Sequence, residues 1–161
     1  MTEETAAPEA NNNQQFAIQK IYTRDISFES PNAPEVFKGE GWNPDIDVQL
    51  TSQSRQLSGP VFEVVLKVTV TAKLEEDRTA YLAEVEQAGV FNISGFSDED
   101  MQYMLGSYCQ NILFPFAREA LSDLVTRGGF PQMVLNPVNF DALLQQQMQE
   151  AQQEAASQPT Q

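Results

Sequence analysis

The chain has 161 residues, a length typical of one domain and sufficient for a sizeable apolar core. Its formal net charge of -14 at pH 7 repels phosphate backbones, so nucleic acid is excluded as an expected partner. Histidine is absent and Cys109 is the only cysteine, which rules out Ser/His/Asp or Cys/His catalysis within the chain and an intrachain disulfide. We therefore expect no cofactor and no metal site.

The two ends of the chain differ from the middle. Residues 1–15 are polar without apolar periodicity, and residues 149–161 are rich in glutamine, so both segments are predicted to be disordered tails. One folded domain then spans residues 16–148. The start lacks the basic and apolar regions of a signal peptide, and no run of about 18 apolar residues occurs. We expect a cytoplasmic protein without direct membrane insertion.

The first predicted strand covers residues 16–29, where apolar and polar side chains alternate. Lys20 and Arg24 interrupt the apolar parity and Ile21 falls on the other parity, which indicates a β-bulge or a face partly covered by another subunit. The apolar parity holds Phe16, Ile18, Tyr22, Ile26 and Phe28.

Three further alternating segments, residues 46–50, 61–74 and 81–89, are predicted strands. Residues 53–60 and 75–78 are predicted to be the turns between them. Four consecutive strands indicate an antiparallel sheet. The loop before the second strand, residues 30–43, is broken by proline and glycine yet contains bulky apolar side chains, which is unusual for a loop.

A long helix is predicted over residues 97–127. Ser97 and the acidic residues after it resemble a helix-capping sequence, and Gly128 ends the pattern. Pro115 lacks a backbone donor and is expected to kink the helix. A shorter second helix is predicted to begin at Asn136-Pro137 or at Asn139 and to end at Met148.

Residues 101–117 contain no charged side chain and are apolar on nearly every side of the predicted helix. A surface helix needs only one apolar stripe, and one sheet with one short helix covers about half of such a helix. Leaving four large side chains in water would forfeit roughly 6–12 kcal/mol, at about 1.5–3 kcal/mol each. We therefore expect an oligomer whose interface contains Met104, Tyr108 and Ile112.

Two features of the sequence are candidates for chemical sites. Cys109 lies among apolar helix residues, which favours a small buried side chain over a nucleophile. Asp45 and Asp47 share one strand face and could hold a cation or act as a carboxylate pair, although solvated acidic residues on a strand are far more common. An enzyme is disfavoured.

Several segments, in order along the chain, resemble the SecB family of export chaperones over residues 16–145. An ordered series of matches is more specific than any single motif. They are residues 21–29 (IYTRDISFE), 31–34 (PNAP), the aromatic stretch from 36–37 (VF) to Trp42, residues 63–71 (EVVLKVTVT), residues 106–119 (GSYCQNILFPFARE), and the stretch from 130–132 (FPQ) to 142–143 (AL).

The resemblance implies an α+β protomer with a four-stranded antiparallel sheet, one long kinked helix and one shorter C-terminal helix, assembled as a homotetramer that is a dimer of dimers. It implies a holdase without catalytic activity that binds unfolded precursor proteins and delivers them to SecA. The implied client groove is lined by Phe37, Trp42, Phe140, Leu143 and Leu144, although Phe140 and Leu143 can equally well be core residues.

For SecA docking, the resemblance implies an acidic patch on the outer sheet face, at Asp25, Glu29, Leu82 and Glu84. Leu82 is a large apolar residue among carboxylates, as a docking surface requires. One alternative stays open: a SecB-like chaperone that serves another client, such as an antitoxin, and has lost SecA docking.

Overall fold

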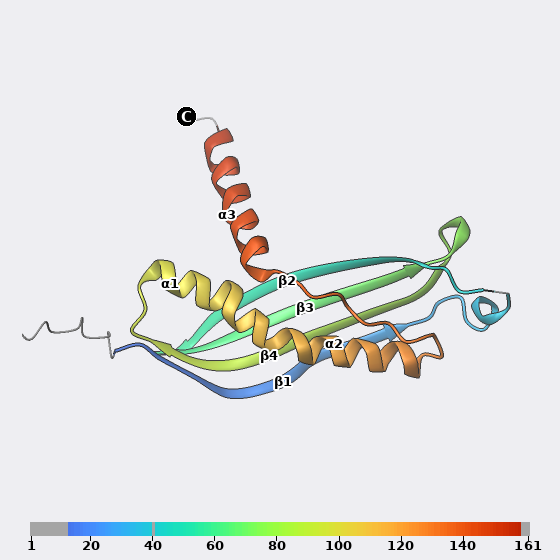
Figure 1. Ribbon diagram of the computed structural model, residues 1–161, viewed down its shortest axis with the longest axis horizontal. Helices are drawn as coiled ribbons and strands as arrows, with labels where there is room; N and C mark the ends of the chain where they lie inside the picture. Colours follow the sequence, from blue (N-terminus) through green and yellow to red (C-terminus); the bar gives the residue numbers. More distant parts are fainter. Residues whose placement is uncertain (1–12, 40, 159–161) are drawn as a thin grey trace, which may run out of the picture.

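A four-stranded antiparallel sheet forms the base of the structure, and helical segments cross one of its faces (Figure 1). The computed structural model describes residues 13–39 and 41–158. The strand order is β1-β4-β3-β2, so β1 and β2 are the edge strands. The predicted antiparallel sheet is confirmed, and its strands are β1 (Gln15–Glu29), β2 (Asp45–Ser58), β3 (Val61–Lys73) and β4 (Thr79–Ser94).

Two strands are longer than predicted. The predicted turn over residues 53–60 is wrong, because β2 continues to Ser58 and only Gly59 and Pro60 turn the chain. This half of β2 is exposed on both faces, so its side chains need no apolar alternation. β4 likewise continues past residue 89 and adds the buried side chains of Phe91 and Ile93 to the core.

The predicted long helix is present as three consecutive segments: α1 (Asp98–Tyr103), a π turn η3 (Met104–Tyr108) and α2 (Cys109–Arg127). The Ser97 side chain accepts a hydrogen bond from the backbone N–H of Asp100 at 3.2 Å, so the predicted cap is confirmed. Pro115 was expected to kink the helix, but α2 continues through it as α-helix. The irregular part of the helix is the π turn η3, which precedes α2. Gly128 is the C-cap of α2.

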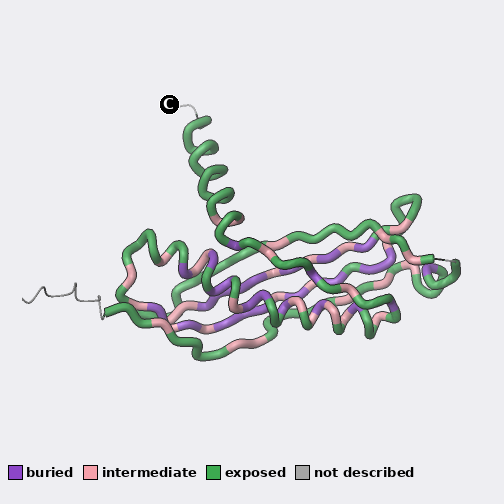
Figure 2. Tube along the Cα trace, viewed as in Figure 1, coloured by how far each residue is buried: buried purple, intermediate pink, exposed green. Residues whose placement is uncertain are grey.

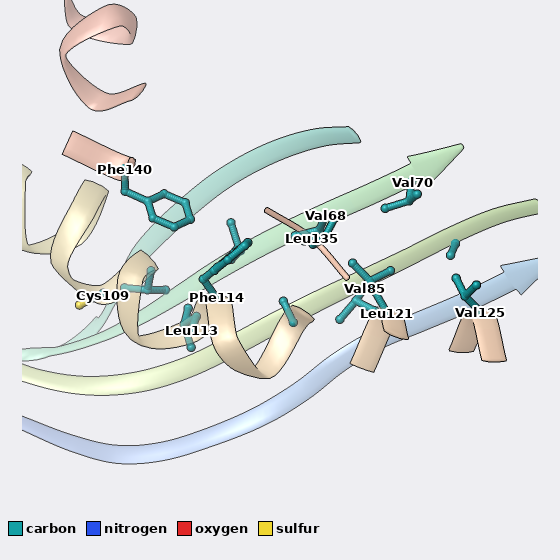
Figure 3. Close-up of a cluster of buried hydrophobic side chains, with 14 of the residues drawn as sticks. Val68, Val70, Val85, Cys109, Leu113, Phe114, Leu121, Val125, Leu135 and Phe140 are labelled. Carbon is teal, nitrogen blue, oxygen red and sulfur yellow. The ribbon is translucent and has the colours of Figure 1, made fainter. Parts of the chain in front are cut away.

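The core lies between α2 and the two central strands. Leu113, Leu121 and Val125 are fully buried, and Figure 3 shows all three pointing from α2 toward the sheet. Burial is concentrated on β3 and β4, whereas the edge strands are mostly exposed (Figure 2). We call the sheet face under α2 the helix face and the opposite face the outer face.

β1 pairs with β4 in three registers, separated by one-residue insertions at Gln19 and Arg24. Each insertion exchanges the faces to which the following side chains point. The predicted bulge in this strand is therefore confirmed. The expected face of Tyr22 is wrong: Ile21 lies on the helix face and packs against the core, while Tyr22 points to the outer face and hydrogen-bonds to Glu63.

α3 (Phe140–Ser157) projects away from the sheet (Figure 1). The Asn139 side chain accepts a hydrogen bond from the Ala142 N–H at 3.0 Å, which selects Asn139 over Asn136-Pro137 as its start. The predicted end at Met148 is wrong, because the helix continues to Ser157. Glutamine, alanine and glutamate all favour helix, and the first breaker is Pro159. Of the two predicted tails, residues 1–12 and 159–161 lie outside the described residues.

Candidate functional site

Aromatic side chains gather at the end of the sheet where the loop between β1 and β2 lies. This loop, residues 30–44, contains the short helix η1 (Glu35–Phe37). The Phe130 ring is central: its centroid lies 5.0 Å from those of Phe37 and Tyr81, and 5.4 Å from that of Trp42. The Phe37 side chain is 49% exposed and forms the outer wall of this aromatic cluster.

The other three predicted groove residues lie on α3. Phe140 is buried and meets Phe114 edge-on, with ring centroids 5.7 Å apart, so it is a core residue in the single chain. Leu143 is partly buried against the core. Leu144 contacts the π turn, where a β-carbon added at Gly106 would lie 2.7 Å from its side chain. A larger residue at this position would therefore displace the Leu144 side chain.

A row of side chains on the helix face of β2 connects these two groups. Ile46 shares its sheet row with Tyr81, and Tyr81 stacks with Trp42. Six residues farther along the strand, Ser52 lines an open groove of about 450 Å³ between α3, η3 and β2, and Leu144 lines the same groove. This distance is roughly 20 Å along the strand. We define the apolar strip as the β2 residues between these points, Ile46, Val48 and Leu50.

Neither the apolar strip nor the groove beside α3 contains a charged side chain. Ile46 and Val48 are 37% and 41% exposed, because α2 lies over β4 and leaves the edge strand uncovered. The groove is lined by serine, glutamine and apolar side chains, among them Leu105 and Met148. Phe37 and Trp42 therefore lie at one end of a continuous uncharged surface and Leu144 at the other.

The four predicted docking residues share the outer face. Glu29 of β1 is directly opposite Leu82 of β4, and Ser27 is opposite Glu84. Asp25 is opposite Glu86, a further carboxylate that sequence reasoning missed. Leu82 remains 36% exposed among these acidic groups. We call Asp25, Glu29, Leu82 and Glu84 the acidic patch.

A second polar cluster on the outer face surrounds Glu63, whose side chain is buried although it is charged. Its carboxylate accepts hydrogen bonds from the Tyr22 hydroxyl and from Arg55 Nε at 2.9 Å, and Arg24 Nη1 lies 3.3 Å away. The Tyr22 hydrogen bond lowers the pKa of Glu63, with the Arg55 hydrogen bond adding to it, while burial opposes the shift. Sequence reasoning missed this cluster, because the strand insertions bring its members together.

The depressed pKa of Glu63 predicts a pH-dependent stability. A carboxyl group whose folded pKa lies below its ordinary value of 4.5 stabilises the fold above that pH, and this contribution is lost as the pH falls through the folded pKa. Glu63→Gln should lower the free energy of unfolding by about 1–3 kcal/mol at pH 7. Urea unfolding should show the difference shrinking below pH 4.5. Glu75→Gln, in the exposed hairpin, is the control, and a constant difference for Glu63→Gln would contradict the assignment.

The predicted interface residues differ in exposure within the single chain. Met104 is already buried by its own chain, Ile112 is partly buried, and Tyr108 is 42% exposed. Tyr108, Ile112 and Phe116 follow one another at intervals of four residues, and the Phe116 side chain is 46% exposed. They form an uncharged ridge along the helix in which Tyr108 and Phe116 are exposed, while Ile112 also packs against the core.

The residues that the sequence suggested for chemical sites, Cys109, Asp45 and Asp47, are not part of the surfaces described above. Cys109 is fully buried, and burial raises its pKa to about 12, so the thiol stays protonated. Asp45 and Asp47 are exposed on the outer face of β2, and no group of three potential metal ligands occurs among the described residues. In the same part of the chain, no helix is both long and apolar enough to cross a membrane.

Comparison with known proteins identifies the family of the chain. Residues 9–151 match the family described as Preprotein translocase subunit SecB. The chain belongs to the SecB family. Protein-export protein SecB of Methylococcus capsulatus is 57% identical over 155 residues, which are 96% of each chain. That of Pseudomonas aeruginosa is 52% identical over 149 residues, covering 92% of this chain and 91% of the relative.

A solved structure shows the same fold at low identity. The SecB-like chaperone of Mycobacterium tuberculosis, in complex with a ChAD peptide from an antitoxin, superposes with a TM-score of 0.62 at 18% identity. The superposition covers 77% of this chain and 91% of that chain. The α+β fold that resemblance to the SecB family implied is thereby confirmed.

Proposed function

We propose that this protein is a cytoplasmic holdase of the SecB family that binds unfolded precursor proteins and delivers them to SecA for export. It acts as a homotetramer, needs no cofactor and catalyses no reaction. The observation that carries the proposal is the uncharged surface that joins the aromatic cluster, the apolar strip and the groove beside α3. The relatives that are 52–57% identical to it are named for protein export.

The chemistry of this surface suits an extended client chain. An unfolded segment of about six residues covers roughly 20 Å, the distance along β2 from Ile46 to the groove at Ser52. Because β2 is an edge strand, its free backbone groups can pair with such a segment while Ile46 and Val48 contact apolar client side chains. Asp45 and Asp47 border the strip from the outer face and favour clients with basic residues.

The acidic patch suits a second, different partner. It lies on the outer face, whereas the strip and the aromatic cluster lie on the helix face, so a client and SecA can bind at the same time. Exposed carboxylates increase the rate of encounter with a basic surface, and Leu82 adds apolar contact once the complex has formed. This arrangement supports transfer of a held client to the export motor.

Client binding is tested through Trp42, the only tryptophan. An unfolded, Trp-free precursor should change the emission of Trp42, because the indole lies beside Phe130 at the end of the strip. The folded form of the same precursor should cause no change, and binding should need no nucleotide. If binding is demonstrated by calorimetry but the emission stays constant, the client surface does not include Trp42.

Docking is tested by association kinetics with SecA. Glu29→Lys should slow association and weaken its dependence on salt, since exposed charges act over a screening length of about 8–10 Å. Leu82→Ala should instead accelerate dissociation, because it removes apolar contact from the formed complex. Both variants should keep wild-type client binding. Unchanged SecA kinetics in both would place the docking surface elsewhere.

The alternative client, an antitoxin, is decided by the same assay. The antitoxin-bound chaperone is only 18% identical to this chain, whereas the relatives named for export exceed 50%. An export chaperone should bind unfolded precursors and SecA together. Client binding without any SecA binding would favour the alternative.

A further inference from the structure

The insertion at Arg24 determines which side chains of β1 reach the outer face. Thr23 is opposite Gln87 and Asp25 is opposite Glu86, so two steps along β1 match one step along β4. After this insertion, Ser27 is opposite Glu84 and Glu29 is opposite Leu82. Without it, Ile26 would be opposite Glu84, and every later side chain of β1 would point to the other face.

Such a slip would dismantle the acidic patch. Asp25 and Glu29 would turn toward the helix face, and Ile26 and Phe28 would turn outward. In the structure, Phe28 packs beside Tyr81, with ring centroids 5.8 Å apart, and contributes to the core. The local sequence therefore fits only the register that contains the insertion.

Two buried polar side chains hold this insertion from opposite faces. On the outer face, Glu63 accepts the Tyr22 hydroxyl and pairs with Arg24, whose Nε also lies 3.7 Å from Glu86. On the helix face, Gln87 Nε2 donates to the Tyr22 carbonyl at 3.0 Å, and Gln87 is only 3% exposed. Buried polar groups of this kind persist only when they are paired, so they define one backbone arrangement.

We propose that Glu63, together with Gln87, is a positioning residue that fixes the Arg24 insertion and so keeps Asp25 and Glu29 on the outer face beside Leu82. Glu63 touches no part of the acidic patch itself and acts through the register of β1. Its consequence for SecA docking rests on the proposed function, whereas the register can be measured without SecA.

Cysteine cross-linking measures the register directly. Ser27→Cys with Glu84→Cys reports the observed register, and Ile26→Cys with Glu84→Cys reports the slipped one. In the Glu63→Ala background, disulfide yield in the first pair should fall at least about tenfold and yield in the second should rise, since a one-residue slip exchanges the two positions. Glu63→Gln keeps an acceptor for Tyr22, so the disulfide yields should change less than in Glu63→Ala. This variant should also weaken SecA binding.

Two controls separate positioning from general destabilisation. Ala17→Cys with Asn92→Cys lies before both insertions and should cross-link equally in all backgrounds. Val65→Ala, a buried change on the same face, should lower the melting temperature yet keep the Ser27 and Glu84 cross-link. If Glu63→Ala does not fold, the cross-linking yields of Glu63→Gln alone decide whether Glu63 fixes the register. Wild-type cross-linking in both folded Glu63 variants overturns the proposal, whereas wild-type protein that fails to bind SecA contradicts the proposed function only.

Discussion

Leu121→Ala should lower the free energy of unfolding by about 2–5 kcal/mol, the range for large-to-small changes at fully buried positions. Leu121 is completely inaccessible in the middle of α2 and points at the sheet (Figure 3). The surrounding side chains come from two β-strands and the helix, so they cannot collapse freely into the space that the missing atoms leave.

Urea unfolding at a fixed protomer concentration measures this effect, because oligomerisation makes stability depend on concentration. Val134→Ala is the matched control: it shortens an apolar side chain that is 61% exposed and should change the free energy by less than about 0.5 kcal/mol. Equal values for the two variants would mean that α2 is not packed on the sheet at Leu121.

Tyr108→Glu should dissociate the proposed homotetramer while leaving each chain folded. The Tyr108 side chain is 42% exposed in the single chain, where it meets Phe16 edge-on with ring centroids 5.0 Å apart. A carboxylate at this position can remain hydrated in a free chain. In an interface built on the ridge with Ile112 and Phe116 it would be buried without a partner, which costs several kcal/mol per site.

Light scattering and circular dichroism at micromolar concentration distinguish the outcomes. The wild type should have the mass of a tetramer, and Tyr108→Glu should have a smaller mass with an unchanged spectrum. Tyr108→Phe, which keeps the ring, should remain tetrameric. A monomeric wild type, or a tetrameric Tyr108→Glu variant, would show that this side of the helix faces water.

Much of the fold follows from local sequence patterns. Alternation in residues 61–74 predicts the central strand β3, because one side of that strand is core and its pattern is set by the helix that covers it. Ser97 and Gly128 predict the ends of the long helix, since caps act within a few residues. The uncharged segment 101–117 predicts that some of its apolar side chains are buried and that others stay exposed in a single chain. Both kinds occur in the structure.

The positions of the candidate surface residues in the fold were predicted in part, whereas their roles remain proposals. All four residues of the acidic patch lie on the predicted outer face, and Phe37 and Trp42 lie together as the resemblance implied. Phe130 was not assigned to the site, although its position just after Gly128 and Gly129, where the chain leaves α2, could have suggested it. In the single chain, Phe140 takes the core position that the sequence left as an alternative.

The sequence by itself determined the sheet, the helices, the excess of negative charge and the membership of the SecB family. Only the tertiary structure decided which face Tyr22 reaches, how far β2 extends and how Glu63 is paired. The physical reason is that these features depend on partners distant in the chain. An edge strand takes its length and register from the neighbour to which it is hydrogen-bonded, and no periodicity within the strand records that pairing.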